Sequence, residues 1–266
     1  MNIAIFHDGG WFHKPLKDDW ESKGHNVMAS PNYSIWPDFE PDLIFFDTCT
    51  ANIIYYSKYI KKTCPAFVRV HGVGIRFNHH RYVDWDKIDG AIFVNKSLKD
   101  KTYSDLVFCP TPGYVVLNGV DLKKFTLKRS FDPTYKIACV SRKIVLKNLD
   151  MVPSIMQKFK DIDERYEIHH AYGQIPHDEM NEWLEDKDYL IHPSGSETFC
   201  YAVAEAMAKG IRPLINNWSG SSETWGEDFY IDDFNLEKDP LMFRYIIEQK
   251  YNQNRMIEET NKICQI

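Results

Sequence analysis

Short apolar runs alternate with amphipathic stretches along the whole chain. The apolar runs predict strands at residues 3–7, 26–29, 43–47, 67–71, 91–95, 136–140, 167–171, 189–192 and 213–216. The stretches between them predict helices at about 14–23, 51–62, 97–104, 148–160, 177–186, 199–209 and 239–263. Because the strands are continuously apolar and are followed by helices, the pattern predicts parallel sheets that are buried on both faces.

A polar, basic stretch interrupts this alternation at residues 118–134. The chain of 266 residues is long enough for two domains of about 120 residues each. We therefore predict an α/β protein with two doubly wound, Rossmann-like domains that face each other across a cleft. The predicted domains are residues 1–122 and 123–266, and the long last helix is free to return to the N-terminal domain.

The composition narrows the class of protein. A hydrophobic content of 44% is typical of an ordered globular chain, and the net charge of -6 gives no general attraction to nucleic acid or anionic lipid. No apolar run is long enough to span a membrane, and the first residues do not resemble a signal peptide. We expect a cytoplasmic protein. Peripheral contact with a membrane surface stays open, because residues 51–63 mix isoleucine and tyrosine with lysines.

The sequence predicts no metal site. Its six cysteines lack CxxC or other zinc-type spacing. The adjacent pair His79-His80 lacks the i,i+4 spacing that places two histidines on one helix face, and Asp232-Asp233 is more typical of a solvated loop.

In doubly wound sheets, ligands bind beyond the carboxyl ends of the strands. The predicted ends carry glycines, small polar residues and a few charges, in the segments His7–Gly10, His71-Gly72, Ser141-Arg142, Pro193–Glu197 and Asn216–Gly220. Turns favour glycine and small polar residues in any protein. Turn chemistry does not account for His71, Arg142 and Glu197 at three separate strand ends.

Two glutamates eight residues apart add a second signal. If a helix begins just after Glu197, its rise places Glu197 and Glu205 roughly 12 Å apart on the same side. This separation suits a ligand with two hydroxyl-bearing rings joined by phosphates, and the helix N-terminus between them favours the phosphates. Taken alone, Glu205 would more often lie on a solvated helix face.

The same residues resemble the E-x7-E signature of family-4 retaining glycosyltransferases, which have the GT-B fold. Further elements of that family follow the right order: Asn118–Asp121 resembles NGVD, Ser141-Arg142 with Lys147 resembles a G-R…K-G phosphate clamp, and Ser219-Gly220 with Glu223 resembles G-G…E. The family writes E-G-F-G where this chain has Glu197-Thr198-Phe199-Cys200. Asn148 replaces the glycine of the clamp, and asparagine tolerates a left-handed backbone.

The resemblance implies roles for these residues. Arg142 and Lys147 would stabilise the leaving diphosphate, and His71 would contact the sugar or the acceptor. Glu205 would bind the ribose, and Glu197 the transferred sugar. The remaining donor-binding candidates are Thr198, Phe199, Cys200, Gly10, Ser141, Ser219 and Gly220.

The resemblance therefore implies a metal-independent, retaining glycosyltransferase that uses a UDP- or GDP-sugar and no cofactor. The acceptor stays open among a glycan, a lipid, a protein and a modified nucleic acid. A nucleotide-sugar-binding or partner-dependent subunit without transferase activity of its own is the alternative, and a homo-oligomer is also open. A phosphorylase or epimerase with the same fold is a third class, but the sequence contains no sign of a cofactor lysine.

Overall fold

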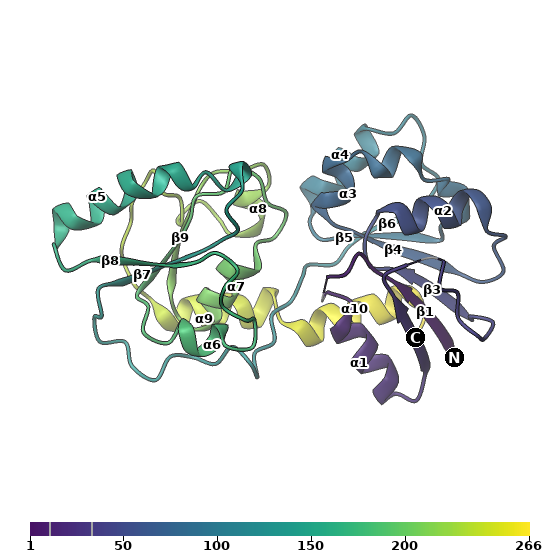
Figure 1. The fold of residues 1–266 in the computed structure, drawn as a ribbon, viewed down its shortest axis with the longest axis horizontal. Helices are drawn as coiled ribbons and strands as arrows, with labels where there is room; N and C mark the ends of the chain where they lie inside the picture. The colour runs from purple at the N-terminus through teal and green to yellow at the C-terminus, as the bar shows by residue number, and fades with distance from the viewer. Residues whose placement is uncertain (11, 33) are drawn as a thin grey trace. The chain divides into compact units, whose positions relative to one another are not determined.

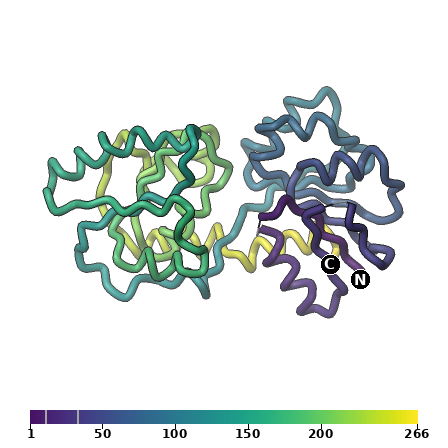
Figure 2. The backbone as a smooth tube through the Cα atoms, viewed as in Figure 1, coloured from purple at the N-terminus to yellow at the C-terminus, as the bar shows by residue number. Residues whose placement is uncertain are grey.

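The computed structural model describes residues 1–10, 12–32 and 34–266. These residues form two compact units (Figures 1 and 2). Unit 1 comprises Met1–Leu117 together with Arg255–Ile266, and unit 2 comprises Asn118–Asn254. The predicted division at residue 122 therefore lies a few residues inside unit 2, and the end of the chain belongs to unit 1 rather than to a continuous domain 123–266. The chain passes between the two units twice.

Unit 1 contains a six-stranded sheet in which all pairings are parallel, in the order β2-β1-β3-β4-β5-β6. Its strands are β1 (Asn2–Phe6), β2 (Asn26–Ser30), β3 (Leu43–Phe46), β4 (Ala66–Val70), β5 (Gly90–Phe93) and β6 (Gly113–Val115). The chain moves from β1 to β2 and then returns past β1 to β3. The topological switch point of this doubly wound sheet therefore lies between β1 and β3.

Helices cover both faces of this sheet (Figure 1). The helices are α1 (Lys14–Ser22), α2 (Ala51–Tyr59), α3 (Gly72–Arg76), α4 (Lys96–Ser104) and α10 (Gln253–Cys264), with 3-10 turns η1 (His79–Tyr82) and η2 (Trp85–Lys87). One core cluster contains Trp20 of α1 and Met256 of α10, and the other contains Ile53 of α2 and Leu98 of α4. The prediction that the last helix returns to the N-terminal domain is confirmed.

Unit 2 contains a four-stranded parallel sheet in the order β10-β9-β7-β8. Its strands are β7 (Lys136–Val140), β8 (Glu167–Ala171), β9 (Tyr189–His192) and β10 (Arg212–Ile215). Its helices are α5 (Val152–Ile162), α6 (Met180–Trp183), α7 (Tyr201–Ala208), α8 (Ser221–Thr224) and α9 (Pro240–Lys250), with 3-10 turns η3 (Val145–Lys147) and η4 (Leu149–Met151). The order of the strands reverses between β7 and β9, so the loops that follow these two strands emerge beside the switch point.

All nine predicted strands are present, and the two doubly wound units confirm the predicted fold class. The structure adds β6, which the apolar pattern missed. Gly113 of this edge strand is half-buried, and Tyr114 and Val115 are exposed, so the strand has no buried apolar run that could have predicted it.

The single helix predicted at 239–263 is wrong, because α9 and α10 are separated at Tyr251 and Asn252. Here the backbone pairs with the NGVD motif instead. Val120 N donates to Tyr251 O at 2.7 Å, and Gln253 N donates to Val120 O at 3.2 Å. A Cβ on Gly119 would lie 2.4 Å from the Cα of Gln253, so glycine is required by this close approach. The NGVD motif is therefore bound by backbone hydrogen bonds to the segment between α9 and α10.

Three other predicted helices begin later or are shorter than expected. Helix α5 begins at Val152 because two 3-10 turns precede it, α6 has four residues, and α7 begins at Tyr201. No helix among the residues that the structure describes is both long enough and apolar enough to cross a bilayer.

Candidate functional site

The predicted donor residues of unit 2 lie in the loops that follow β7, β9 and β10 and in helix α7. The η3 turn packs on the loop that follows β9, since Gly195 N donates to Leu146 O at 3.0 Å and Ser194 Oγ donates to the same oxygen at 3.1 Å. Asn148 follows this turn with φ 45° and ψ 43°, which confirms the expected left-handed backbone. These contacts place Lys147 beside the loop that carries Glu197.

Lys147 and Glu197 form an ion pair, and Glu197 Oε1 also lies 2.9 Å from His192 Nε2. The side chains of Lys147 and Glu197 are each 15% exposed. Burial alone would favour the neutral acid, but the contacts of Glu197 with His192 and Lys147 outweigh burial and lower its pKa to about 2. Glu197 is therefore a carboxylate at neutral pH.

His192 is the last residue of β9 and is almost fully buried. Burial disfavours its charged form, yet contacts with Cys200 and Glu197 raise the pKa of His192 to about 9. Cys200 precedes α7 with φ 71°, the left-handed region that glycine adopts without strain. The ligand atoms of His192, Glu197 and Cys200 all lie within 4.8 Å of one another. The sequence predicted no metal site, and the structure brings these three potential ligands together.

Glu205 is buried in α7, which excludes the alternative that it lies on a solvated helix face. Its Oε1 lies 2.8 Å from His177 Nε2, and His177 Nδ1 lies 2.9 Å from Lys124 Nζ. Burial raises the pKa of Glu205 above its usual value, although His177 and Lys124 oppose the shift. Glu197 lies outside α7, so helical rise does not set the separation of the two glutamates as the sequence analysis assumed.

The loop between Glu197 and α7 is held by aromatic packing. Phe199 is buried against the rings of Trp225 and Tyr251, with ring centroids 5.3 and 5.4 Å away. Trp225 Nε1 donates to Phe199 O at 2.9 Å. Phe199 therefore anchors the loop, and its half-buried neighbours Thr198 and Cys200 lie on either side of this anchor.

Ser141 and Arg142 follow β7. Ser141 is buried, and its backbone N–H donates to Ala171 O at 2.9 Å, which extends the pairing of β7 with β8. The Arg142 side chain is exposed. Ser219 is exposed in the loop after β10, and Gly220 has φ 89° just before α8.

Two predicted site residues belong to unit 1. His71 is buried at the start of α3 with its ring stacked on Phe12 at 5.1 Å. Burial, with a smaller contribution from Arg69, lowers the pKa of His71 to about 3, so the ring is neutral. Gly10 follows β1 and donates its N–H to Asp8 Oδ1 at 3.3 Å. It lines a cavity of about 560 Å³ together with His7 and the first residues of α1.

Sequence reasoning missed several charged residues of these regions. Asp47 and Arg69 form a fully buried ion pair of 3.5 Å at the ends of β3 and β4. The sequence could have indicated this pair only because each charged residue lies inside an apolar run. His177, which contacts Glu205, and Lys124, which contacts His177, lie in loops, and no spacing rule connects loop residues to a distant helix. His192 could have been predicted as a site residue, because it is the last residue of a predicted strand.

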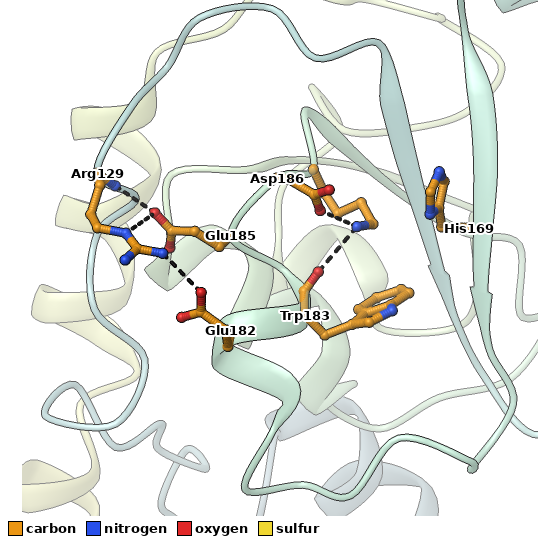
Figure 3. Close-up of a pocket in the computed structure, with 7 residues that line it drawn as sticks. Arg129, His169, Glu182, Trp183, Glu185 and Asp186 are labelled. Carbon is orange, nitrogen blue, oxygen red and sulfur yellow. Dashed lines mark hydrogen bonds and ion pairs between the residues drawn. The ribbon is translucent and has the colours of Figure 1, made fainter.

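A polar pocket of about 520 Å³ also occurs in unit 2, away from these residues (Figure 3). Arg129 bonds to Glu182 at 2.9 Å and to Glu185 at 3.1 Å in its wall. Asp186 and Lys187 of the same pocket precede β9, so the pocket lies at the amino end of that strand, opposite to the loops described above. Its charges pair with one another, and none of the residues predicted for the site lines it.

Most of the segment that matches a known protein family lies in unit 2. Residues 156–262 match the family model described as glycosyl transferases group 1. Protein CapJ of Staphylococcus aureus is 26% identical over 113 residues, which cover 40% of this chain and 29% of CapJ. One component of the human phosphatidylinositol N-acetylglucosaminyltransferase is 25% identical over 166 residues, which cover 53% of this chain and 34% of that protein. The matched segments thus span about a third of these curated relatives.

Solved structures match the whole chain. Sucrose-phosphate synthase from Thermosynechococcus elongatus superposes with a TM-score of 0.70 at 12% identity, over 100% of this chain and 98% of that one. The Anabaena protein HepE, solved with UDP and glucose, gives a TM-score of 0.65 at 13% identity, over 97% of this chain and 98% of that one. At these identities the likeness establishes the fold, which is the GT-B fold.

Proposed function

We propose that this chain is a retaining glycosyltransferase that moves a sugar from a nucleotide-sugar donor to an acceptor. The observation that supports this most strongly is the position of Lys147, Glu197 and Glu205. Lys147 and Glu197 lie in the loops beside the switch point of unit 2, and Glu205 lies in the helix that follows. The match of residues 156–262 to a glycosyltransferase family covers both glutamates.

The cationic side chains of Arg142 and Lys147 bind the diphosphate of the donor. When the bond from the anomeric carbon to the phosphate oxygen breaks, negative charge grows on the leaving nucleoside diphosphate. Fixed positive groups that face this charge lower the barrier, because they interact more strongly with the transition state than with the donor. Arg142 and Lys147 fill this role. Backbone and side-chain groups of Ser141, Ser219 and Gly220 complete the proposed phosphate environment.

The two carboxylates bind hydroxyl groups of the donor. Glu205 accepts hydrogen bonds from the ribose, and Glu197 from the transferred sugar. A buried carboxylate makes strong, charge-assisted bonds to hydroxyl groups, and the cost of its burial is offset only while it has partners. His177 supplies such a partner to Glu205 and is itself bonded to Lys124, and His192 and Lys147 supply partners to Glu197. The HepE structure, which holds UDP and glucose, supports a UDP-sugar as the first donor to test.

In unit 1, His71 is proposed to contact the sugar or the acceptor, and Gly10 is proposed to bind the donor. The pKa of His71 lies far below neutrality, so the ring acts as a neutral hydrogen-bonding group rather than as a cation. Retention of configuration is proposed to proceed on one face of the sugar without a protein nucleophile. The ammonium and guanidinium groups take the part that a divalent metal plays in other transferases, so catalysis is proposed to need none.

A donor screen tests this function. UDP- and GDP-sugars are added to the chain, and both thermal stabilisation and release of free sugar are measured. We expect one donor to raise the melting temperature and to be slowly hydrolysed, and Glu205→Gln to abolish both effects. Glu182→Gln, which changes an exposed glutamate of the polar pocket, is the matched control. A chain that neither binds nor hydrolyses any donor would overturn the proposal, and the anomer of the first-formed product, read by NMR, tests retention.

A further inference from the structure

Three side chains at the carboxyl end of β9 have the chemistry of a metal site. His192 offers a ring nitrogen, Glu197 a carboxylate oxygen and Cys200 a sulfur, and these atoms all lie within 4.8 Å of one another. Nitrogen, oxygen and sulfur are the three donor types that zinc binds. We propose that His192, Glu197 and Cys200 bind a zinc-type divalent cation, with release of the ring proton of His192 and the thiol proton of Cys200 to solvent, and that this cation and the nucleotide sugar exclude each other.

The ligands are held in place by their surroundings. The ring of His192 is 2% exposed and packs edge-on against Trp218, with centroids 6.1 Å apart. Cys200 follows Phe199, which the buried rings of Trp225 and Tyr251 fix in position. A cation therefore meets side chains whose positions the fold already sets, and only small shifts bring them to bonding distance.

Cys200 also carries a conformational cost. At φ 71° the backbone of a cysteine is strained, whereas that of glycine is not. The chain keeps a thiol at a position where glycine would fit without strain. This is a second feature of the position, in addition to the distances, that metal binding explains.

Exclusion of the donor follows from the shared carboxylate. Lys147 pairs with Glu197, and a divalent cation on Glu197 repels the ammonium group from it. Glu197 is then occupied and cannot bind the sugar, and Lys147 loses the contact that places it. Three protein ligands leave one position of a tetrahedral site for water. The metal site rests on the cluster alone, and only the competition rests on the proposed function.

Cobalt(II) binding to the whole, reduced chain tests the site directly. We expect one equivalent of Co²⁺ to give an absorption band from thiolate-to-cobalt charge transfer. The band should vanish in Cys200→Gly, which suits the backbone at this position and therefore keeps the fold, and should remain in Cys64→Ser. His192→Gln should weaken Co²⁺ binding at least about tenfold. A band that persists in Cys200→Gly, or that disappears in Cys64→Ser, would overturn the site.

The competition is tested with Zn²⁺ and UDP-glucose. Zn²⁺ should weaken UDP-glucose binding to the unaltered chain, and Cys200→Gly should lose this dependence on Zn²⁺ whatever its own affinity. Equal UDP-glucose affinity with and without bound Zn²⁺ would overturn the competition and leave the metal site standing. A cobalt band in a chain that binds none of the screened nucleotide sugars would overturn the proposed function and the competition, but not the metal site.

Discussion

Lys147 and Glu197 are bonded to each other, although sequence resemblance gives them different partners on the donor. Lys147 lies in η3 and Glu197 lies fifty positions later, and the packing of Leu146 on the loop after β9 brings them together. The pair keeps the ammonium group beside the carboxylate. In the proposed function, the diphosphate of the donor meets a cation that is already positioned.

Substitution of the two cations tests their catalytic role. Arg142→Ala and Lys147→Ala are each expected to lower kcat by about 10²–10³, because each removes a positive group that faces the charge growing on the diphosphate. The losses should not add in the double variant. Lys143→Ala is the control, since this neighbouring lysine is exposed and lies 4.4 Å over the ring of Tyr172. If Arg142→Ala or Lys147→Ala keeps a near-normal kcat at saturating donor, the substituted residue is not part of the proposed clamp.

Glu205→Ala is expected to weaken UDP binding by on the order of 1.5–3 kcal/mol, because the ribose hydroxyls lose a charged partner. Calorimetry with UDP alone measures this without catalysis. Glu182→Ala should leave UDP affinity unchanged. Unaltered affinity in a folded Glu205→Ala variant would refute the ribose assignment.

Stability should depend on pH through the contacts of His192 with Cys200 and Glu197. The pKa of His192 is raised to about 9, so its contribution is complete below its unfolded value of 6.5 and is lost as pH rises through 9. The pKa of Glu197 is lowered to about 2, so its contribution is lost only as pH falls through 2. Between about pH 6.5 and 9.5 the free energy of unfolding should decrease by on the order of 2 kcal/mol. Denaturant titrations measure the decrease, and His192→Gln should reduce it; an equal decrease in that variant would contradict the assignment.

Gly119→Ala should destabilise the chain by roughly 2–4 kcal/mol, because the new Cβ would lie 2.4 Å from the backbone of Gln253. Gly195→Ala is the comparison, since there the nearest atom belongs to the movable side-chain end of Asn148. Chemical denaturation of both variants gives the difference. Equal stability of the two variants would mean that residues 118–121 and 251–253 can move apart at little cost in free energy.

Transfer activity should survive a chelator, because the proposed clamp uses an ammonium and a guanidinium group in place of a metal. If trace zinc occupies the site at Cys200, EDTA should raise the rate. Loss of activity on chelation, with recovery in magnesium or manganese, would contradict the proposed mechanism.

The sequence predicted the strands well, and therefore also the positions of the strand-end residues in the candidate site. Arg142 and Glu197 follow continuous apolar runs, and the parallel-sheet rule places such residues at one edge of the sheet. The same reasoning fails for partners that come from loops. His177 contacts Glu205 because of how the segment after β8 turns back, and no periodicity encodes this turn. The break at Tyr251 was equally hidden, because a helical pattern continues across it and only the approach of Val120 interrupts the backbone.

The return of α10 to unit 1 has a consequence for the order of folding. During synthesis, the six strands of unit 1 leave the ribosome well before Met256 and Cys264, which complete one of its two cores. All of unit 2 is made in between. Until then, α1 is the one helix among the described residues whose side chains pack in this core, so part of the apolar surface of the sheet is exposed to water or to other chains. Chaperone dependence should therefore be greatest for nascent chains that end between residues 117 and 255.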